Sequence, residues 1–241
     1  MNLIMYRGRP SVLTGAVRCY ERMRKRRSSP RALDDGEPNS QHRLTFDREE
    51  QFKRKLEVIL KAATLSLNQL GYSGTSLRKL AASLNITDSA LYHYVKTKDE
   101  LAYLCYMRTL DYSELALAKA HTQGRDGLQK LQIYIRNQIE ATCGPDGPTA
   151  TLSDLPSLRI PHRMRVLKRM DACRDIVIQF FEEGFKDGTV GPCNAFDSSL
   201  VIWGAMTFLA KWTDRHGSVE IGELADTYVG VLTSGVAARR Q

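Results

Sequence analysis

The sequence predicts an all-α protein in which a small N-terminal three-helix domain is followed by a larger helical domain. Apolar residues recur at spacings of three and four from about residue 48 onward, which is the period of amphipathic helices. Glycine and proline clusters separate these stretches, and the sequence contains neither alternating strand patterns nor a strand–helix–strand rhythm.

Charge divides the chain into three parts. The net charge is +5 over residues 1–47, +5 over residues 48–98 and −2 over residues 99–241. A basic head on a slightly acidic body predicts a polyanion, a class that includes double-stranded DNA, as the partner of the head and a different partner for the body.

Cysteine usage and hydropathy exclude several classes of protein. The five cysteines are widely spaced and form no CxxC pair, which argues against a disulfide framework and a structural zinc site. The longest apolar run, residues 200–210, is too short to span a bilayer, and no signal peptide is visible at the N-terminus. We therefore expect a cytoplasmic protein with no metal, no cofactor and no membrane association.

The N-terminal third contains a tail and three helices. Residues 1–47 are expected to form a disordered basic tail, which is either a non-specific DNA arm or a solvated extension. A first helix over about 52–70 should end at Gly71, and a second should run from a cap at Thr75 or Ser76 to about Leu84. After a turn at Asn85–Ile86, Thr87 should cap a third helix to about Tyr94. Residues 48–98 thus form the predicted DNA-binding domain.

The remaining residues, 99–241, should form a second domain of five helices. Their expected ranges are about 97–120, 126–143, 161–185, 195–215 and 220–237. Thr97 and Glu100 have the spacing of a capping box, Pro161 suits a first helical turn, and Asn194 can cap the helix that follows it.

Two short helices joined by a tight turn are the parts of a helix-turn-helix, whose second helix enters the major groove. Four residues give the first of them a buried face: Leu77, Leu80, Ala81 and Leu84. The second helix leaves hydrogen-bonding residues facing outward, which suits base edges and phosphates: Thr87, Asp88, Ser89, Tyr92 and His93.

These residues also carry a family resemblance. The run Ala62-Ala63, Leu67, Gly71-Tyr72, Thr75-Ser76-Leu77, Leu80-Ala81, Leu84-Asn85-Ile86, Ala90-Leu91-Tyr92, Lys98 and Leu101 resembles the N-terminal domain of TetR-family regulators. The resemblance implies that six residues contact DNA: Ser76, Thr87, Ser89, Tyr92, His93 and Lys98. Asp88, Val95 and Lys96 depart from the family's usual residues.

The resemblance implies that the body pairs two chains and holds an effector. A homodimer would space two recognition helices by about 34–36 Å and so require a palindromic operator. We expect the helices at 195–215 and 220–237 to form the pairing surface, because residues 200–212 are apolar on most faces. The alternative is a central helix within one subunit.

The effector site is expected between the helices of the body. Seven residues are its candidate lining: Tyr103, Met107, Ile139, Met170, Phe181, Trp203 and Phe208. Methionine and aromatic side chains suit an apolar or amphipathic small molecule such as a fatty acyl compound, although each of these residues also fits a plain core. His162, Arg163 and Arg165 either pair with an acidic group of the ligand or form a solvated basic helix start.

The sequence therefore predicts a DNA-binding repressor that a small effector releases from its operator. A non-sensing, architectural DNA-binding protein of the same fold is the alternative. No catalytic residues are predicted, because the motifs of hydrolases, metalloproteases and nucleotide-binding enzymes do not occur.

Overall fold

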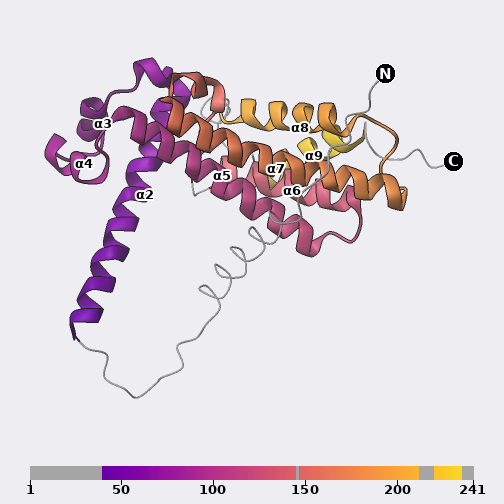
Figure 1. Ribbon diagram of the computed structural model, residues 1–241, viewed down its shortest axis with the longest axis horizontal. Coiled ribbons are helices and arrows are strands. Elements are labelled where there is room, and N and C mark those ends of the chain that lie inside the picture. The colour runs from indigo at the N-terminus through magenta and orange to yellow at the C-terminus, as the bar shows by residue number, and fades with distance from the viewer. Residues whose placement is uncertain (1–39, 145–146, 212–219, 235–241) are drawn as a thin grey trace.

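A computed structural model describes residues 40–144, 147–211 and 220–234 (Figure 1). These parts of the chain contain eight α-helices and one short 3₁₀-helix, which lies between α6 and α7. Their bounds are α2 Ser40–Gly74, α3 Leu77–Ser83, α4 Asp88–Tyr94, α5 Lys98–Gln123, α6 Gly127–Cys143, η1 Leu152–Ser157, α7 Ile160–Asp187, α8 Ala195–Leu209 and α9 Ile221–Ser234. The prediction of an all-α fold is confirmed.

Helix α2 begins earlier than the sequence pattern indicates. It starts at Ser40, eight residues before the domain boundary expected at residue 48. No glycine or proline follows Pro38 until Gly71, so nothing in this stretch opposes helix formation. Residues 1–39 of the predicted tail lie outside the described residues. In Figure 1, the N-terminal half of α2 projects away from the rest of the molecule.

Three of the expected helix caps are confirmed. The hydroxyl of Thr87 accepts a hydrogen bond from the Ala90 N–H at 3.2 Å, and that of Thr97 accepts one from the Glu100 N–H at 3.0 Å. The side chain of Asn194 accepts hydrogen bonds from two N–H groups in the first turn of α8. Each bond satisfies a donor that a helix start would otherwise leave unpaired.

The cap expected for α3 is wrong. Ser76 occupies the N-cap position, but its side chain makes no capping bond. The Thr75 hydroxyl instead donates to the carbonyl of Gly71 at 2.9 Å, because Gly71 turns the chain out of helical geometry with a φ of 70°. The Thr75 N–H donates to the same carbonyl at 3.2 Å, so local hydrogen bonds hold the end of α2 beside the start of α3.

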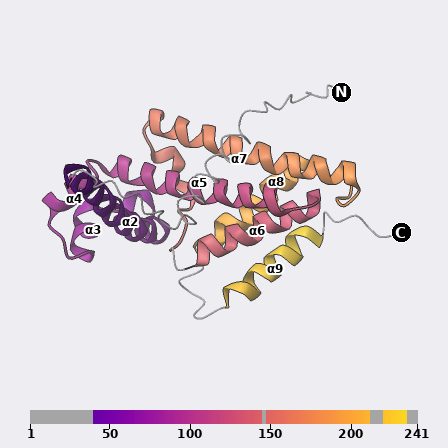
Figure 2. The same cartoon turned by 90° about the horizontal axis from the view of Figure 1, so that it is seen from below.

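One helix lies at the centre of the fold. Helix α5 packs against α2 in the headpiece and against α6 and α7 in the body, and α6 in turn packs against α8 and α9 (Figure 2). Buried side chains along α5 run from Leu101 to Ala120 without a gap larger than one helical turn. The headpiece and the body thus share one hydrophobic core.

Helices α6 and α7 approach closely where two glycines meet. A Cβ added to Gly127 would lie 2.2 Å from the backbone nitrogen of Gly184, so only glycine fits there. The carboxylate of Asp187 accepts a hydrogen bond from the Gly127 N–H at 2.8 Å.

None of the helices in the described parts of the chain combines the length and the apolar content that crossing a membrane requires.

Candidate DNA-binding face and effector cavity

The two helices of the predicted helix-turn-helix are fixed by a short turn and a small core. Asn85 has a φ of 53° in the turn, and the Ile86 N–H donates to the carbonyl of Ala81 at 3.0 Å. Ala81, Leu91 and Val95 are fully buried beneath the turn. A left-handed asparagine reverses the chain here within three residues, which sets α4 across α3.

Four predicted DNA-contacting residues lie on the exposed side of α4 or at its start. Thr87, Ser89, Tyr92 and His93 are all exposed, and the Tyr92 side chain is 45% accessible although it is large and partly apolar. His93 also contacts α2, because its ring lies edge-on to Phe52 at 5.9 Å between centroids. The rest of this face is free to meet a groove of DNA.

The other two predicted contacts are less exposed. Ser76 is half-buried at the start of α3. Lys98 is also half-buried, and its ammonium donates to the carbonyl of Ser73 at 3.0 Å and lies 4.7 Å from the centre of the Tyr72 ring. Lys98 therefore holds the loop before α3 in place, a role that the sequence alone did not indicate.

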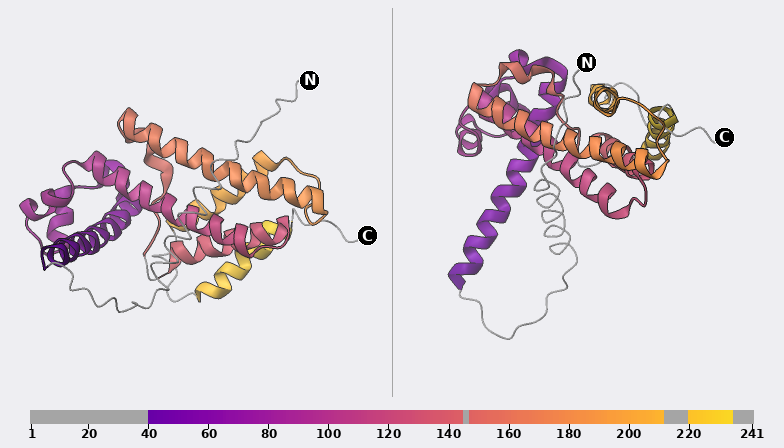
Figure 3. Two further views of the ribbon diagram at one scale, coloured as in Figure 1. Left: turned by 60° about the horizontal axis from the view of Figure 1, so that its bottom comes forward. Right: turned by 45° about the vertical axis from the view of Figure 1, so that its right-hand side comes forward.

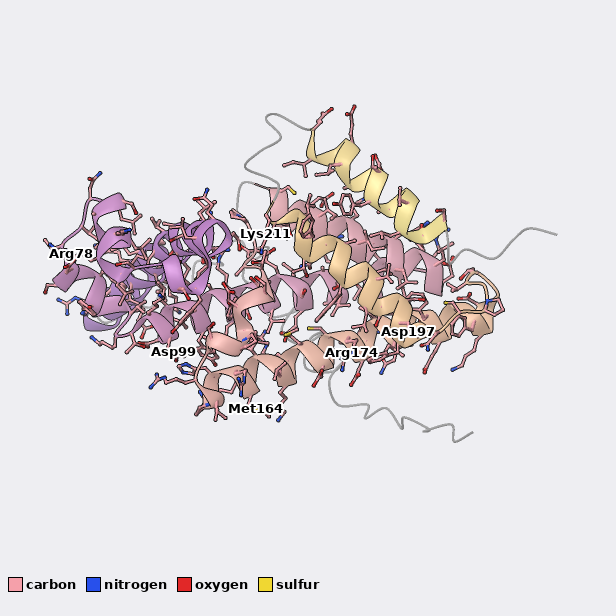
Figure 4. The ribbon with its side chains drawn as sticks, turned by 90° about the horizontal axis from the view of Figure 1, so that it is seen from above. Arg78, Asp99, Met164, Arg174, Asp197 and Lys211 are labelled. Atoms are coloured by element: carbon pink, nitrogen blue, oxygen red, sulfur yellow. The ribbon has the colours of Figure 1, made fainter. Side chains whose placement is uncertain are left out.

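Two exposed cations extend this face beyond the predicted set. Arg78 and Lys79 lie in the first turns of α3, and Figure 4 shows Arg78 at the outer end of the headpiece, far from the body. The Lys96 ammonium donates to the carbonyl of Tyr92 at 2.6 Å and so lies over the end of α4. A basic pair directly after the start of a helix is a signal for phosphate binding that was present in the sequence.

A buried carboxylate joins the headpiece to the body. Asp99, in the first turn of α5, is 8% exposed and accepts hydrogen bonds from the Arg159 N–H at 2.7 Å and the Arg159 guanidinium at 2.9 Å. The ring of His162 also contacts this carboxylate and stacks on Tyr103 with 4.2 Å between centroids. Burial by itself would raise the pKa of Asp99, but the hydrogen bonds from Arg159 and His162 hold the pKa below its ordinary value.

These contacts account for one residue of the basic start of α7. His162 pairs with an acidic group of the protein itself. The roles expected for Arg163 and Arg165 stay predictions. Tyr103 belongs to the same cluster, because its ring stacks on that of His162. Figure 4 shows Asp99 between the headpiece and the first turns of α7, where Met164 is labelled.

The body contains a small polar cavity between α5, α6, α8 and the segment before η1. Its volume is about 30 Å³, which is room for about two water molecules. Its lining residues are Thr109, Leu110, Ser113, Tyr134, Gln138, Thr142, Thr149, Ala150, Trp203, Met206 and Thr207. None of these side chains is charged.

Hydrogen bonds organise the cavity wall. The Trp203 indole N–H donates to the Tyr134 hydroxyl at 2.7 Å, and Ser113 donates to the Gln138 carbonyl oxygen at 3.2 Å. Burial raises the pKa of Tyr134, so its hydroxyl stays protonated and remains a donor at neutral pH. The cavity therefore offers neutral hydrogen-bonding groups and an aromatic ring.

Six of the seven residues predicted to line an effector pocket do not line this cavity; only Trp203 does. Ile139 and Phe181 are fully buried core residues, and Phe208 is 58% exposed on the outer side of α8. Met107 and Met170 pack against the core, and the Met107 carbonyl accepts from Arg169. An apolar helical pattern looks the same in a core and in a pocket, so the assignment of these residues to an effector pocket stays a prediction.

A different sequence signal marks the residues that line this cavity. Thr109 and Ser113 are four residues apart on the buried face of α5, and Gln138 and Thr142 have the same spacing on α6. Polar residues at helical spacing on buried faces must find partners with one another or with a bound molecule. The sequence contained this pattern.

Comparisons with known proteins agree with this architecture. Residues 59–103 match a family model described as bacterial regulatory proteins of the tetR family, and residues 124–236 match one described as a tetracyclin repressor-like C-terminal domain. The HTH-type transcriptional repressor KstR2 of Rhodococcus jostii (strain RHA1) is 24% identical over 194 residues, which are 77% of this chain and 92% of that protein.

Solved structures share the fold. The ketosteroid transcriptional regulator KstR2 of Mycobacterium tuberculosis superposes with a TM-score of 0.67 at 16% identity, over 77% of this chain and 96% of that one. AibR, solved in complex with isovaleryl coenzyme A and operator DNA, superposes with a TM-score of 0.62 at 21% identity, over 73% of this chain and 96% of that one.

The depressed pKa of Asp99 predicts how stability depends on pH. A carboxyl whose pKa is lower in the folded state stabilises the fold above its unfolded pKa of about 3.9, and this contribution is lost as the pH falls through the folded pKa. We expect Asp99→Asn to lower the free energy of unfolding by about 1–2 kcal/mol at pH 7 and to have a progressively smaller effect as the pH falls through the depressed pKa of Asp99. Urea unfolding at several pH values measures this, with the exposed Asp226→Asn as the control. Equal losses at all pH values would contradict the assignment.

Proposed function

Because the chain belongs to the TetR family of bacterial regulatory proteins, we propose that it is a transcriptional repressor that a small molecule releases from its operator. As a member of that family it is a DNA-binding, ligand-responsive regulator of transcription and not an enzyme. The repressing output, the form of the operator and the chemistry of the effector are parts of the proposal.

The exposed face of α4 is the observation that carries the DNA-binding part of the proposal. Short polar side chains at Thr87 and Ser89 can approach base edges, and Tyr92 and His93 can reach base edges or phosphates. Arg78 and Lys79, at the start of α3, add charge for the DNA backbone. We therefore assign recognition of the DNA bases to α4, and positioning of the protein on the DNA backbone to α3.

Two chains are proposed to pair through α8 and α9. Helix α8 exposes large apolar side chains on its outer side, with Val201 at 66% and Phe208 at 58%, and α9 exposes Val231 at 68%. An added Cβ at Gly204 or Gly230 would meet nothing within 4 Å, so a partner helix can approach closely. Figure 3 shows both helices at the edge of the body, with no other described helix over their outer side. Such an exposed apolar surface is typical of a protein–protein interface.

The effector is proposed to place a neutral, hydrogen-bonding group in the cavity. A carboxylate there would lose its hydration without gaining a counter-charge, which is unfavourable by several kcal/mol. A carbonyl can accept hydrogen bonds from Tyr134 and Gln138, and Trp203 with Met206 can cover a small apolar group. An acyl compound that carries a thioester or ketone carbonyl has this chemistry, and AibR is a protein of the same fold that was solved with isovaleryl coenzyme A.

A second candidate function follows from the size of the cavity. Room for about two water molecules is also what a DNA-binding architectural protein without an effector would have. Such a protein would bind DNA, but no small molecule would change its melting temperature or its affinity for DNA.

Operator binding by α3 can be tested with DNA from upstream of the protein's own gene. We expect Arg78→Ala to weaken binding by roughly threefold to tenfold at 0.1 M salt and to lower the slope of log affinity against log salt by about one. Fluorescence anisotropy measures both quantities, and Lys168→Ala, an exposed lysine on α7, is the matched control. An unchanged salt slope would remove Arg78 from the DNA-binding face.

Scrambling one half of a palindromic site should lower affinity at least about a hundredfold.

The pairing surface can be tested by placing a charge on it. Val201→Glu should convert a dimer into a monomer at micromolar concentration, because each partner would bury a carboxylate in an apolar interface. Sedimentation velocity measures the state of association. The control is Ile160→Glu, which replaces an equally exposed aliphatic side chain on α7. A variant that remains dimeric would show that the chains pair elsewhere.

The effector site can be tested with isovaleryl coenzyme A, other short acyl thioesters and the corresponding free acids. We expect a thioester to release operator DNA and Gln138→Leu to raise the concentration required at least about tenfold, with ligand-free operator affinity unchanged. Gln129→Leu, on the same helix outside the cavity, is the control. Release by the free acids alone would contradict the neutral-group proposal, and no thermal shift with any compound would favour the architectural protein.

A further inference from the structure

The cavity cannot admit an effector without movement of one of its walls. Its volume of about 30 Å³ is far below the several hundred Å³ that small-molecule sites usually occupy. Three walls are helices whose side chains are packed in the core: Leu110 on α5, Tyr134 on α6 and Met206 on α8 are all buried. The fourth wall is a non-helical strap, residues 148–151, which contributes Thr149 and Ala150.

Side chains from the body hold the strap on its cavity side. The Ala150 N–H donates to the Thr109 hydroxyl at 2.8 Å, and the hydroxyls of Thr142 and Thr149 are 3.0 Å apart. The Arg108 guanidinium donates to the carbonyl of Pro148 at 3.3 Å. Thr109 and Thr142 line the cavity, on α5 and α6, whereas Arg108 also pairs with Glu57 of α2 at 2.7 Å and so contacts the headpiece as well.

One headpiece side chain holds the strap on its other side. Asn68, on α2, accepts a hydrogen bond from the Thr151 N–H at 2.9 Å and donates to the carbonyl of Thr149 at 3.0 Å. Its amide also lies 3.4 Å from the carbonyl of Ala210, at the end of α8. The side chain thus bonds to the strap backbone as a neighbouring β-strand would.

A second contact joins the same two regions a few residues later. Asp154, in η1, accepts a hydrogen bond from the Tyr72 N–H at 2.6 Å, directly after Gly71. Gly71 has a positive φ and lies close to this carboxylate, so the end of α2 is shaped around it. The strap and η1 are therefore bonded to the headpiece at two positions, and Asn68 is the one that faces the cavity wall.

We propose that Asn68 is the residue that couples the effector cavity to the DNA-binding headpiece, by closing the 148–151 strap when the headpiece is bound to DNA. This inference rests on the proposed function. An effector that displaces the strap must break the Asn68 hydrogen bonds, and a headpiece held on DNA keeps them. Because coupling between two sites is reciprocal, DNA must stabilise the closed strap by the same factor by which the effector weakens DNA binding.

The coupling can be measured without knowing the effector, by hydrogen exchange of the strap with and without duplex DNA from upstream of the protein's own gene. In the unaltered protein, DNA should slow exchange of the Ala150 and Thr151 amides by roughly fivefold or more, the usual range of such coupling. Asn68→Asp keeps the side-chain shape but turns its donor toward two carbonyls into an acceptor, and should reduce this effect to less than about twofold. Asn137→Asp, whose amide bonds to Lys119 and Ile133 instead, is the matched control and should behave like the unaltered protein.

A second variant removes the same bond from the strap. Thr151 has a φ of −69°, which proline also adopts, so Thr151→Pro deletes the N–H that bonds to Asn68 in a compatible backbone. In a Trp212→Phe background, both variants should also increase acrylamide quenching of Trp203, the remaining tryptophan, at the cavity wall.

The outcomes separate this inference from the function on which it rests. Protection of the strap that is equal in Asn68→Asp and in the unaltered protein would overturn the role of Asn68 while leaving the repressor proposal intact. Binding of DNA without any protection of the strap would do the same. A duplex that does not bind the unaltered protein would overturn the proposed function, and the coupling with it.

Discussion

The structure depends on the packing of α5, which belongs to the headpiece at one end and to the body at the other. Leu101 is buried against the headpiece, and Leu117 and Ala120 are buried among body helices. Well-packed cores resist gradual deformation and change between discrete arrangements. The headpiece can therefore change its orientation only if side chains along this helix, or the bonds beside it, change as well. Asp99 lies where the two regions meet, and its hydrogen bonds to Arg159 and His162 connect the start of α5 with the start of α7.

The elements near this junction differ in how easily they can move. The contact between α6 and α7 is rigid, whereas the strap between α6 and η1 is more adaptable. Gly127 and Gly184 bring α6 and α7 into backbone contact, so those two helices can separate but cannot move closer. The strap between α6 and η1 is held by side-chain hydrogen bonds, among them those of Asn68, and by burial of the small Ala150 side chain. Hydrogen bonds of this kind each contribute about 1 kcal/mol, which is small compared with repacking a helix interface. Movement of the strap is accordingly the least costly way to enlarge the cavity.

The sequence was sufficient to predict the helices and the headpiece, but it was not sufficient to predict the cavity. Caps at Thr87 and Thr97 and the turn at Asn85 act over a few neighbouring residues, so local patterns predict them. The cavity is formed by side chains from three helices and a loop, and its shape follows from packing that no local pattern encodes. Apolar residues such as Phe181 satisfied the expected pocket chemistry, yet they lie in the core. Lys98, which is predicted to contact DNA, also supports the loop before α3, and this second contact joins residues 25 positions apart.

The exposed apolar side of α8 has a consequence for how sharply this regulator responds to its own abundance. If only paired chains bind both halves of an operator, then occupancy at low protein concentration rises with the square of the number of chains in the cell. Doubling synthesis would quadruple binding in that regime, and halving it would release the operator disproportionately. Exposed residues such as Val201 and Phe208, which do not line the cavity, would therefore set the protein concentration at which the operator becomes occupied.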